Sequence, residues 1–249
     1  RQLLFQKKYR EATDMTLKTQ VCAGPGSGAA LGADLPYGSY QTLGDLWIDA
    51  GTTGAFENYE RALDLERGVV SVTYRRNAVT FTREVFASYP DRALVVRLAA
   101  DRKGAVSFTA TLTRPERFNT QAAGASILMT GSMKNGRGGE GMRYAAHLTV
   151  IPVGGTVRYQ DSAVVVRGAN AATLIITAAT DYRADAPGVR GADPVAASLK
   201  NLKAASSRPY RMLLSRHSAD YSALAGRVRL QVGQAVVDTI PTNRRLANQ

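Results

Sequence analysis

Pairs of closely spaced carboxylates are the first candidates for catalytic residues in this sequence. Asp64 and Glu66 lie two residues apart in a strand-like segment, a spacing that puts both side chains on one face. Asp45 and Asp49 flank Trp47. Glycoside hydrolysis uses two such carboxylates. Exposed strand faces carry acidic pairs routinely, however, so a solvent-facing role is the favoured interpretation of both pairs.

The two histidines, His147 and His217, are candidates for general base catalysis. Ser/His/Asp chemistry needs a histidine placed on a nucleophile and oriented by an acid, and the sequence contains no Gly-x-Ser-x-Gly elbow. We interpret His147 as a half-buried strand residue, and His217, on a basic helix, as a packing or surface residue. With one cysteine, Cys22, the chain has no ligands for a Cys-cluster zinc site, and we expect neither a metal nor a cofactor.

Two glycine-rich stretches contain parts of phosphate-binding patterns. Residues Gly24–Ala29 fit a dinucleotide fingerprint, which requires a strand before it and a helix after it. Here a helix precedes the stretch and more loop follows, which indicates a loop without a cofactor. Residues Asn135–Gly141 lack the Lys-Ser/Thr of a phosphate loop and are predicted to form a hairpin end.

Trp47 is the only tryptophan of the chain. A lone tryptophan on a strand is more often a core residue than a platform for a sugar ring, because its large apolar surface favours burial. The core interpretation is therefore favoured, and sugar stacking stays open as the alternative.

The charge balance is strongly basic, with 32 Lys and Arg against 20 Asp and Glu, and a net charge of +12. Between residues 194 and 219 there are five cations and no acid: Lys200, Lys203, Arg208, Arg211 and Arg216. Clustered cations can bind phosphates. Only 7% of residues are aromatic, and no motif of single-strand-binding proteins is present. Binding of nucleic acid or another anionic polymer is therefore the weaker interpretation of these cations. The favoured interpretation is a solvated helical face or a surface that contacts another domain.

Most of these candidate residues fall in segments that are predicted to be strands. Apolar and polar residues alternate with period two from residue 45 to 180, which predicts strands at 45–50, 58–66, 70–75, 79–86, 94–96, 106–113, 125–131, 143–152, 162–167 and 172–179. Many strands joined by short turns indicate an antiparallel β-sandwich. The consecutive apolar residues 94–96 indicate a central strand covered on both faces.

Helices are predicted at the two ends of the chain. Residues 1–19 form an amphipathic pattern, and a glycine- and proline-rich loop follows at 23–39. Asp193 and Pro194 are suited to start a helix, and a second helix is predicted after Pro209. We expect a last strand at 227–232 and a linker at 238–243. The predicted domains are a sandwich at 1–180 and a helical linker with a final strand at 181–249. No apolar run is long enough to span a membrane.

Several segments, in order along nearly the whole chain, share one resemblance. They are Leu3–Phe5 with Tyr9–Ala12, Tyr40–Trp47, Tyr59–Glu66, Phe81–Asp91 with Val95–Leu98, His217–Tyr221 and Pro241–Leu246. Together they resemble the N-terminal region of glycoside hydrolase family 95, the α-L-fucosidases. Thr42 and Asn243 depart from the family pattern, which usually has a proline and an acid there.

The resemblance implies a supersandwich-type β-sandwich and a helical linker, followed in family members by an (α/α)6 catalytic barrel and a C-terminal β domain. Members hydrolyse terminal α-L-fucose, typically α1,2-linked, with inversion and without a metal. Their catalytic Glu, Asn and Asp lie in the barrel, and no position of this chain matches them. The resemblance also implies a periplasmic or extracellular location. It further implies that first strands precede residue 1, which would leave a sheet edge open to self-association.

The sequence therefore predicts a non-catalytic N-terminal domain that supports its own catalytic barrel in an enzyme acting on fucosylated oligosaccharides. Gln41, Asp45 and Trp47 are the candidates for contact with substrate. Fucose and L-galactose both remain possible sugars. The alternative is a standalone carbohydrate-binding module that uses Trp47, Tyr37 and Tyr40. No membrane partner is expected.

Overall fold

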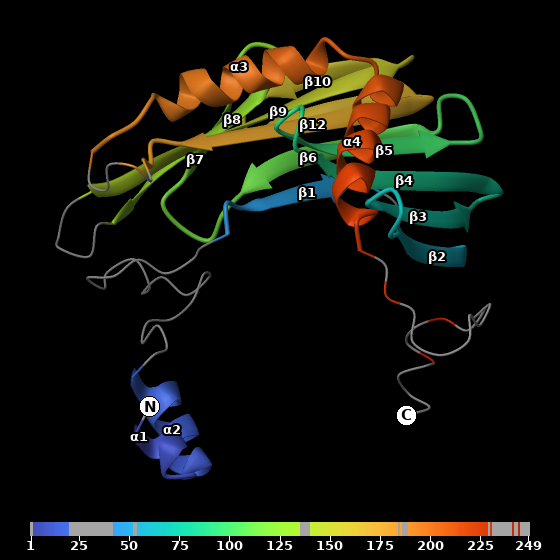
Figure 1. Ribbon diagram of the computed structural model, residues 1–249. Coiled ribbons are helices and arrows are strands. Elements are labelled where there is room, and N and C mark those ends of the chain that lie inside the picture. The colour runs from blue at the N-terminus through green and yellow to red at the C-terminus, as the bar shows by residue number, and fades with distance from the viewer. Residues whose placement is uncertain are drawn as a thin grey trace.

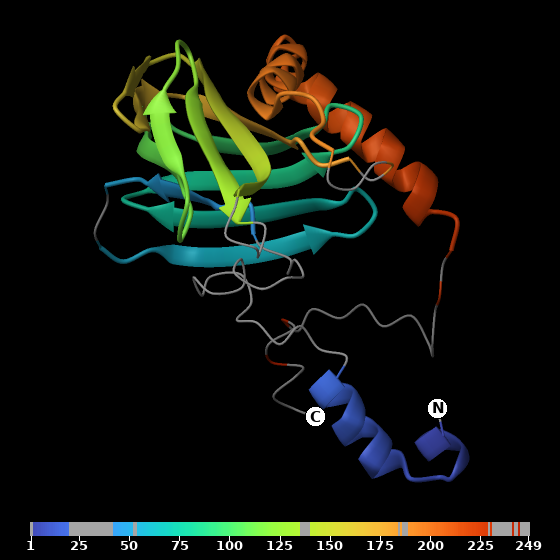
Figure 2. The same ribbon diagram turned by 90° about the vertical axis from the view of Figure 1, so that its left-hand side faces the viewer.

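Two antiparallel β-sheets packed face to face form the body of the molecule, and two helices cover the larger sheet from outside (Figure 1). The computed structural model describes residues 2–19, 42–51, 54–134, 140–183, 185, 189–228, 230, 241 and 244. The predicted mainly β, antiparallel sandwich is confirmed. Figure 2, a view turned by 90°, shows the helices α3 (Pro194–Ser206) and α4 (Tyr210–Ala225) on one side of the strands.

The two sheets differ in size. Within the described residues, the smaller sheet has the order β1 (Asp45–Asp49), β6 (Val106–Thr113), β11 (Ala163–Ala169), β10 (Thr156–Gln160). The larger has the order β2 (Glu57–Asp64), β3 (Val69–Arg76), β4 (Val79–Ser88), β5 (Ala93–Ala100), β12 (Ala171–Thr180), β9 (Glu140–Val153), β8 (Ile127–Lys134), β7 (Asn119–Ala122). The larger sheet therefore continues past the smaller one at one end.

The main hydrophobic core lies between the sheets. In β6 the alternation places Phe108, Ala110 and Leu112 inward, where they are buried, and leaves the threonines between them half-exposed. Buried side chains of the larger sheet complete this core: Val96, Ile127, Met129, Leu148, Val150, Leu174 and Ile176. The period-two pattern thus decides which residues fill the sandwich.

A second apolar layer joins the larger sheet to helices α3 (Pro194–Ser206) and α4 (Tyr210–Ala225). Val95 and Ile175 of the sheet pack there with Leu202 and Leu213 of the helices. Val95 faces the helices and its neighbour Val96 faces the other sheet, which confirms a central strand covered on both faces. The division of the chain into domains at residue 180 stays a prediction.

The helix start predicted at Asp193 is confirmed. The Asp193 carboxylate accepts a hydrogen bond from the backbone N–H of Ala196 at 3.0 Å, and Pro194 is the first helical residue. The second helix begins at Tyr210, directly after Pro209, as predicted. The Asp193 cap therefore fixes where α3 begins, whereas α4 begins after Pro209 without a side-chain cap.

The N-terminal helix differs from its prediction because it is broken. α1 covers Gln2–Phe5 and α2 covers Tyr9–Thr19. Lys7 between them has a φ of 59°, a left-handed conformation that a right-handed helix cannot include. Leu4 and Phe5 are exposed, and α1 and α2 lie apart from the sheets in Figure 2. No helix within the described residues is long and apolar enough to cross a bilayer.

Some predictions fall on residues that the structure does not describe. Cys22, the whole loop 23–39 with its glycine-rich stretch 24–29, and residues 135–139 lie outside the described residues. Of the strand predicted at 227–232, Arg227, Val228 and Leu230 are described and are not in a strand. β7 and β10 are short strands that the sequence did not predict.

Candidate functional site

The outer face of β1 presents the candidate substrate-contacting residues that the structure describes. The strand alternates, so that Asp45, Trp47 and Asp49 are exposed, while Leu46 and Ile48 pack on the core. Trp47 is 63% exposed, which makes its interpretation as a core residue wrong. The sequence did contain a signal for the exposure of Trp47, because its neighbours Leu46 and Ile48 are apolar and occupy the face that turns to the core. Gln41, Tyr37 and Tyr40 lie outside the described residues.

Threonines of β6 lie beside Trp47 on this face. In the register of β1 with β6, Trp47 lies opposite Thr111, and the two flanking aspartates lie opposite Thr113 and Thr109. Cross-strand partners share a face, so an indole ring, carboxylates and threonine side chains lie on one face of the smaller sheet. Such a surface offers an aromatic platform together with hydrogen-bond acceptors and donors for a sugar.

Asp64 and Glu66 do not form a carboxylate pair on one strand face, contrary to the prediction. β2 ends at Asp64, and Glu66 lies in the turn that follows. The Asp64 carboxylate accepts hydrogen bonds from the backbone N–H groups of Glu66 and Arg67, both at 3.0 Å. Asp64 therefore stabilises a turn, as aspartates often do.

His147 is a fully buried structural residue, where the sequence predicted a half-buried one. It is 2% exposed on β9, and its Nδ1 lies 2.9 Å from the Ser198 hydroxyl of α3. Ser198 donates to the carbonyl of Pro194 at 2.7 Å, so the imidazole can donate to Ser198. Burial lowers the pKa of His147 and keeps the ring neutral. The residue fastens α3 to the sheet.

His217 is a packing residue, one of the two roles predicted for it. It is 5% exposed, and its Nε2 lies 3.0 Å from the carbonyl oxygen of Gly68. Its ring stacks on Phe86 at 4.8 Å and on Tyr221 at 6.0 Å between centroids. These contacts hold α4 against β4 and leave no open position for a substrate.

Two buried aspartates each contact two arginines. Asp91 accepts hydrogen bonds from Ser88 Oγ at 2.7 Å and Arg216 Nε at 2.9 Å, and Arg208 Nε lies 3.7 Å away. Asp181 accepts from Arg143 at 2.8 Å and Arg190 at 2.9 Å. Burial alone would raise the pKa of Asp181, but the hydrogen bonds from these arginines outweigh it and lower the pKa.

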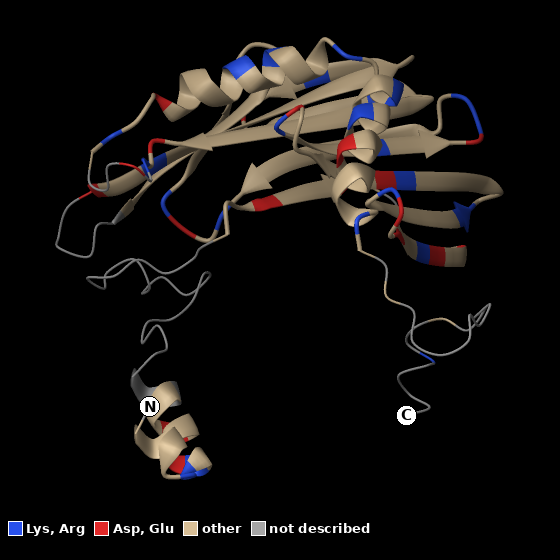
Figure 3. Cartoon of the chain, viewed as in Figure 1, with Lys and Arg blue, Asp and Glu red and all other residues tan. Residues whose placement is uncertain are grey.

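Two of the five cations between residues 194 and 219 form ion pairs within the fold. Arg208 and Arg216 both face Asp91, so they are engaged in ion pairs. Lys200, Lys203 and Arg211 remain exposed. Figure 3 shows Lys and Arg also on strands and turns, interspersed with acidic residues, so no single basic band marks a nucleic-acid surface in this view.

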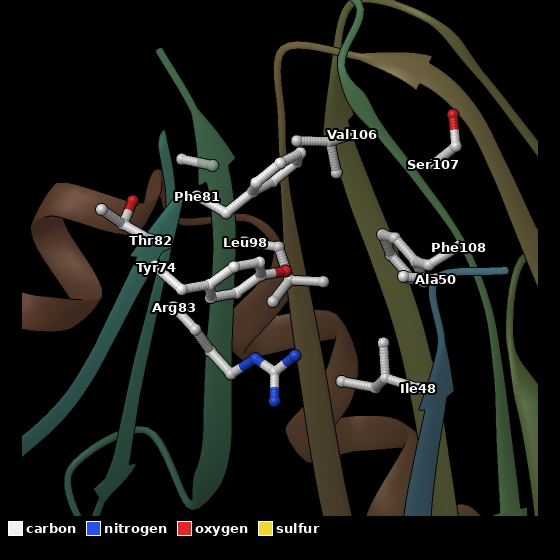
Figure 4. A pocket seen from close by; sticks show the side chains of 11 residues that line it. Ile48, Ala50, Tyr74, Phe81, Thr82, Arg83, Leu98, Val106, Ser107 and Phe108 are labelled. Atoms are coloured by element: carbon white, nitrogen blue, oxygen red, sulfur yellow. The ribbon is translucent and has the colours of Figure 1, made fainter. Parts of the chain in front are cut away.

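A cleft opens between the sheets at the β1 end of the sandwich. The space in and in front of the cleft, open solvent included, is about 410 Å³, and Figure 4 shows the lining residues. The larger sheet contributes Tyr74, Phe81 and Arg83, and the smaller sheet contributes Ile48 and Phe108. Tyr74 and Phe81 stack at 5.3 Å between centroids. The described lining residues are aromatic, aliphatic and hydroxyl-bearing side chains, with Arg83 as the one charged group among them.

The cleft was missed at the sequence level. The available signal was the alternation in residues 79–86, where both faces carry apolar members and Arg83 interrupts one of them.

Across the described residues, no group of three or more His, Cys, Asp or Glu side chains could hold a metal ion. The arrangement as a whole offers binding surfaces and structural ion pairs.

Comparison with known proteins identifies a matching family and several relatives of the chain. Residues 1–185 match the family model described as glycosyl hydrolase family 65, N-terminal domain. The chain is 27% identical to alpha-L-fucosidase 2 of Arabidopsis thaliana over 96% of the chain and 30% of that relative. It is 30% identical to probable alpha-fucosidase A of Aspergillus niger over 83% of the chain and 27% of that relative.

A solved structure described as a putative kojibiose phosphorylase from the human microbiome is also similar, with a TM-score of 0.47 and 15% identity. This likeness covers 67% of the chain and 25% of that structure. The chain spans less than a third of the length of the curated relatives that it matches.

Proposed function

The chain belongs to the family of glycosyl hydrolase family 65 N-terminal domains, and from this premise we propose that it is the non-catalytic support domain of an enzyme that hydrolyses terminal α-L-fucosyl linkages, typically α1,2. The observation that carries the proposal is the match to two relatives named as fucosidases over 96% and 83% of the chain. The resemblance to glycoside hydrolase family 95 supports the same substrate class. We extend the proposal to a periplasmic or extracellular location on that resemblance.

The proposed support role agrees with the chemistry of the described residues. The buried histidines and aspartates are engaged in contacts that hold helices and turns to the sheet. Apolar side chains remain exposed on α4 and after it, namely Met212, Leu224, Val228 and Leu230. An exposed apolar surface of this kind is suited to contact with another domain. The proposed partner is the catalytic domain of the same enzyme.

A hydrolysis assay tests the substrate and the division of labour together. The complete gene product and the chain 1–249 are each incubated with 2′-fucosyllactose, with and without inorganic phosphate, and with an α-L-galactoside analogue. We expect the complete product to release free fucose independently of phosphate, and the chain 1–249 to release none. Fucose release by the chain 1–249 alone would disprove the non-catalytic role, and a complete product that releases no fucose would disprove the substrate.

The support role has its own test at Leu224, which is 59% exposed. Leu224→Ser is expected to lower the melting temperature of the complete product and to leave that of the chain 1–249 unchanged. Val153→Ser, at a 46% exposed position in β9, serves as the control. An equal effect of Leu224→Ser in both proteins would argue against a contact between α4 and the catalytic domain.

A second candidate function, carbohydrate binding by this domain itself, is favoured by the exposure of Trp47 beside Asp45. Since Trp47 is the only tryptophan, its fluorescence reports ligand binding directly. We expect titration with fucosylated oligosaccharides to change the emission, and Asp45→Asn and Gln41→Ala to weaken binding. Asp185→Asn, at an exposed carboxylate, is the control. An emission spectrum that does not respond to the sugar would reject this candidate.

A further inference from the structure

The outer face of the smaller sheet lies on the side of the molecule away from the helices. α3 and α4 pack on the larger sheet (Figure 1), so they leave the outer face of β1, β6, β11 and β10 open. Trp47, 63% exposed, lies on this face between the exposed Asp45 and Asp49. The carbohydrate binding proposed above concerns β1, and the other three strands bear on which class of carbohydrate the face can take.

One row of side chains crosses this face from β1 to β10. Trp47 lies opposite Thr111 of β6, and Thr111 lies opposite Ala163 of β11. Ala163 lies opposite Gln160, an exposed residue at the far edge of the sheet. Paired residues direct their side chains to the same face. The row therefore begins with a large aromatic ring, ends with an amide and has small side chains between them.

A second row lies beside the first, two residues away along each strand. Its members, in strand order, are Asp49, Thr109, Val165 and Arg158. Neighbouring strands lie about 4.8 Å apart, so about 14 Å separate β1 from β10. In both rows the side chains that can bind a ligand at a distance lie over the two outer strands, and compact Thr, Ala and Val side chains lie over the two middle strands.

The polar groups of the two rows are available for hydrogen bonds. Within the described part of the chain, the side chains of Thr109, Thr111, Arg158 and Gln160 form no hydrogen bond or ion pair with another residue. The Asp49 carboxylate accepts one backbone N–H, at 2.7 Å, and keeps its second oxygen. Hydroxyl, amide, guanidinium and carboxylate groups together offer both donors and acceptors, as a ligand rich in hydroxyl groups requires.

The charges on this face favour a neutral ligand. Asp45 and Asp49 lie on β1, and the exposed Arg158 and Arg167 lie on β10 and β11. A polyanion that binds the arginines would be repelled by the aspartates. A protein partner is disfavoured as well, because Trp47 is the only large apolar side chain exposed on the described strands of this sheet, and protein interfaces have an apolar core.

We propose that the outer face of the smaller sheet binds the main chain of a neutral polysaccharide or oligosaccharide. The sugar rings follow the direction of β6 and β11. One ring packs against the indole of Trp47, and its hydroxyl groups exchange hydrogen bonds with Thr111 and Gln160. Sugar rings have apolar faces and a rim of hydroxyl groups, which match an aromatic ring beside polar side chains.

This inference rests on the proposed carbohydrate binding by the domain and extends it from a fucosyl group to the chain that carries it. Binding of the main chain would hold the enzyme on one polymer molecule. The concentration of fucosyl groups near the catalytic domain would rise for that reason, without any change in the catalytic residues.

Calorimetric titration of the complete gene product with chains of different length tests the class of ligand. The probes are cellohexaose, xylohexaose and mannohexaose, the disaccharide of each, and hexagalacturonate as a charged control. None carries fucose, so none is a substrate for fucose release. We expect a neutral hexasaccharide to bind at least about tenfold more tightly than its disaccharide, because it contacts more of the face. Equal affinity for the two lengths, tighter binding of hexagalacturonate, or no binding of any probe would overturn the inference.

Two variants with a matched control test the location. We expect Trp47→Ala and Gln160→Ala each to weaken binding of that hexasaccharide by about fivefold or more. Gln121→Ala, at an exposed glutamine on β7 of the larger sheet, should leave it unchanged. All three positions are exposed, so the melting temperatures should stay within about 2 °C of the unmodified protein. Equal affinities of the Gln160→Ala and Gln121→Ala variants would overturn the assignment of this face.

Failure of this inference and failure of the proposed function give different results. Binding of 2′-fucosyllactose to the chain 1–249 that depends on Trp47 but not on Gln160, without a gain from longer chains, would overturn the inference and leave carbohydrate binding at β1 standing. An absence of binding to every sugar would overturn both. Release of fucose by the complete product is a separate measurement, because it reports the catalytic domain.

Discussion

Replacement of Asp91 tests whether ion pairs at long sequence separation hold α4 to the sheet. The Asp91 side chain has no solvent exposure, and it binds Arg216, which is 125 residues away in the chain. In Asp91→Asn the amide oxygen can still accept the hydrogen bond from Ser88. The charge that Arg216 and Arg208 face is lost, because an amide is neutral.

The size of the effect follows from these contacts. A hydrogen bond to a charged partner contributes about 1.5–3 kcal/mol to stability. Removing one partner of a fully buried pair costs about 3–5 kcal/mol. Arg216 and Arg208 are 40% and 32% exposed, so water can solvate them again in the variant and the lower range applies. We expect Asp91→Asn to reduce the free energy of unfolding by about 2 kcal/mol, which corresponds to a melting temperature lower by about 4–8 °C.

Urea denaturation followed by circular dichroism measures this change. The control is Asp185→Asn, because the Arg183–Asp185 pair has a short distance of 2.6 Å but Asp185 is 72% exposed. Water screens such a pair, so we expect no measurable change. A double-mutant cycle with Arg216→Met should give a coupling energy of about 1–2 kcal/mol. Equal stability of Asp91→Asn and the control, or a coupling of zero, would refute the reasoning.

Two further predictions concern the same helical layer. Burial lowers the pKa of His147 below 6.5, so as the pH falls the unfolded chain takes up a proton before the folded one. The contribution of His147 to the free energy of unfolding should therefore be complete above pH 6.5 and should decline below it. Urea denaturation at a series of pH values should show a flatter decline for His147→Gln. An unchanged decline in the variant would contradict this. Gly68 has a φ of 64°, and a Cβ there would lie 2.9 Å from the ring of Tyr221, so Gly68→Ala should cost about 2 kcal/mol. Gly168→Ala, at a φ of 63° with nothing within 4 Å, should cost clearly less, and equal melting temperatures of the two variants would rule out the ring contact as a cause.

The sequence predicted much of the local structure. Residues 106–113 alternate so regularly that the predicted strand coincides with β6. Asp193 and Pro194 predicted the start of α3, because capping depends on residues within one turn. β7 and β10 were missed because they are short, and β7 reads Asn-Thr-Gln-Ala without apolar alternation. Lys7 gives no signal for its positive φ, and so the break between α1 and α2 was missed as well.

The candidate site was less accessible to sequence reasoning. Asp45 and Trp47 were selected from their types and their resemblance to a family segment, but the exposure of Trp47 depends on which face of β1 turns to the core. The cleft joins Ile48 to Tyr74 and Arg83, which come from different sheets. Such contacts appear only after the strands are ordered.

The period-two strands and the helix starts follow from the amino-acid sequence alone, because they depend on neighbours a few residues apart, and the basic charge follows from the composition. The order of strands in the two sheets, the pairing of Asp91 with Arg216 and the burial of His147 under α3 became apparent once the fold was known. The physical reason is that strand order and long-range pairing depend on how the whole chain buries its apolar faces and satisfies its buried charges at once. No local pattern contains that information.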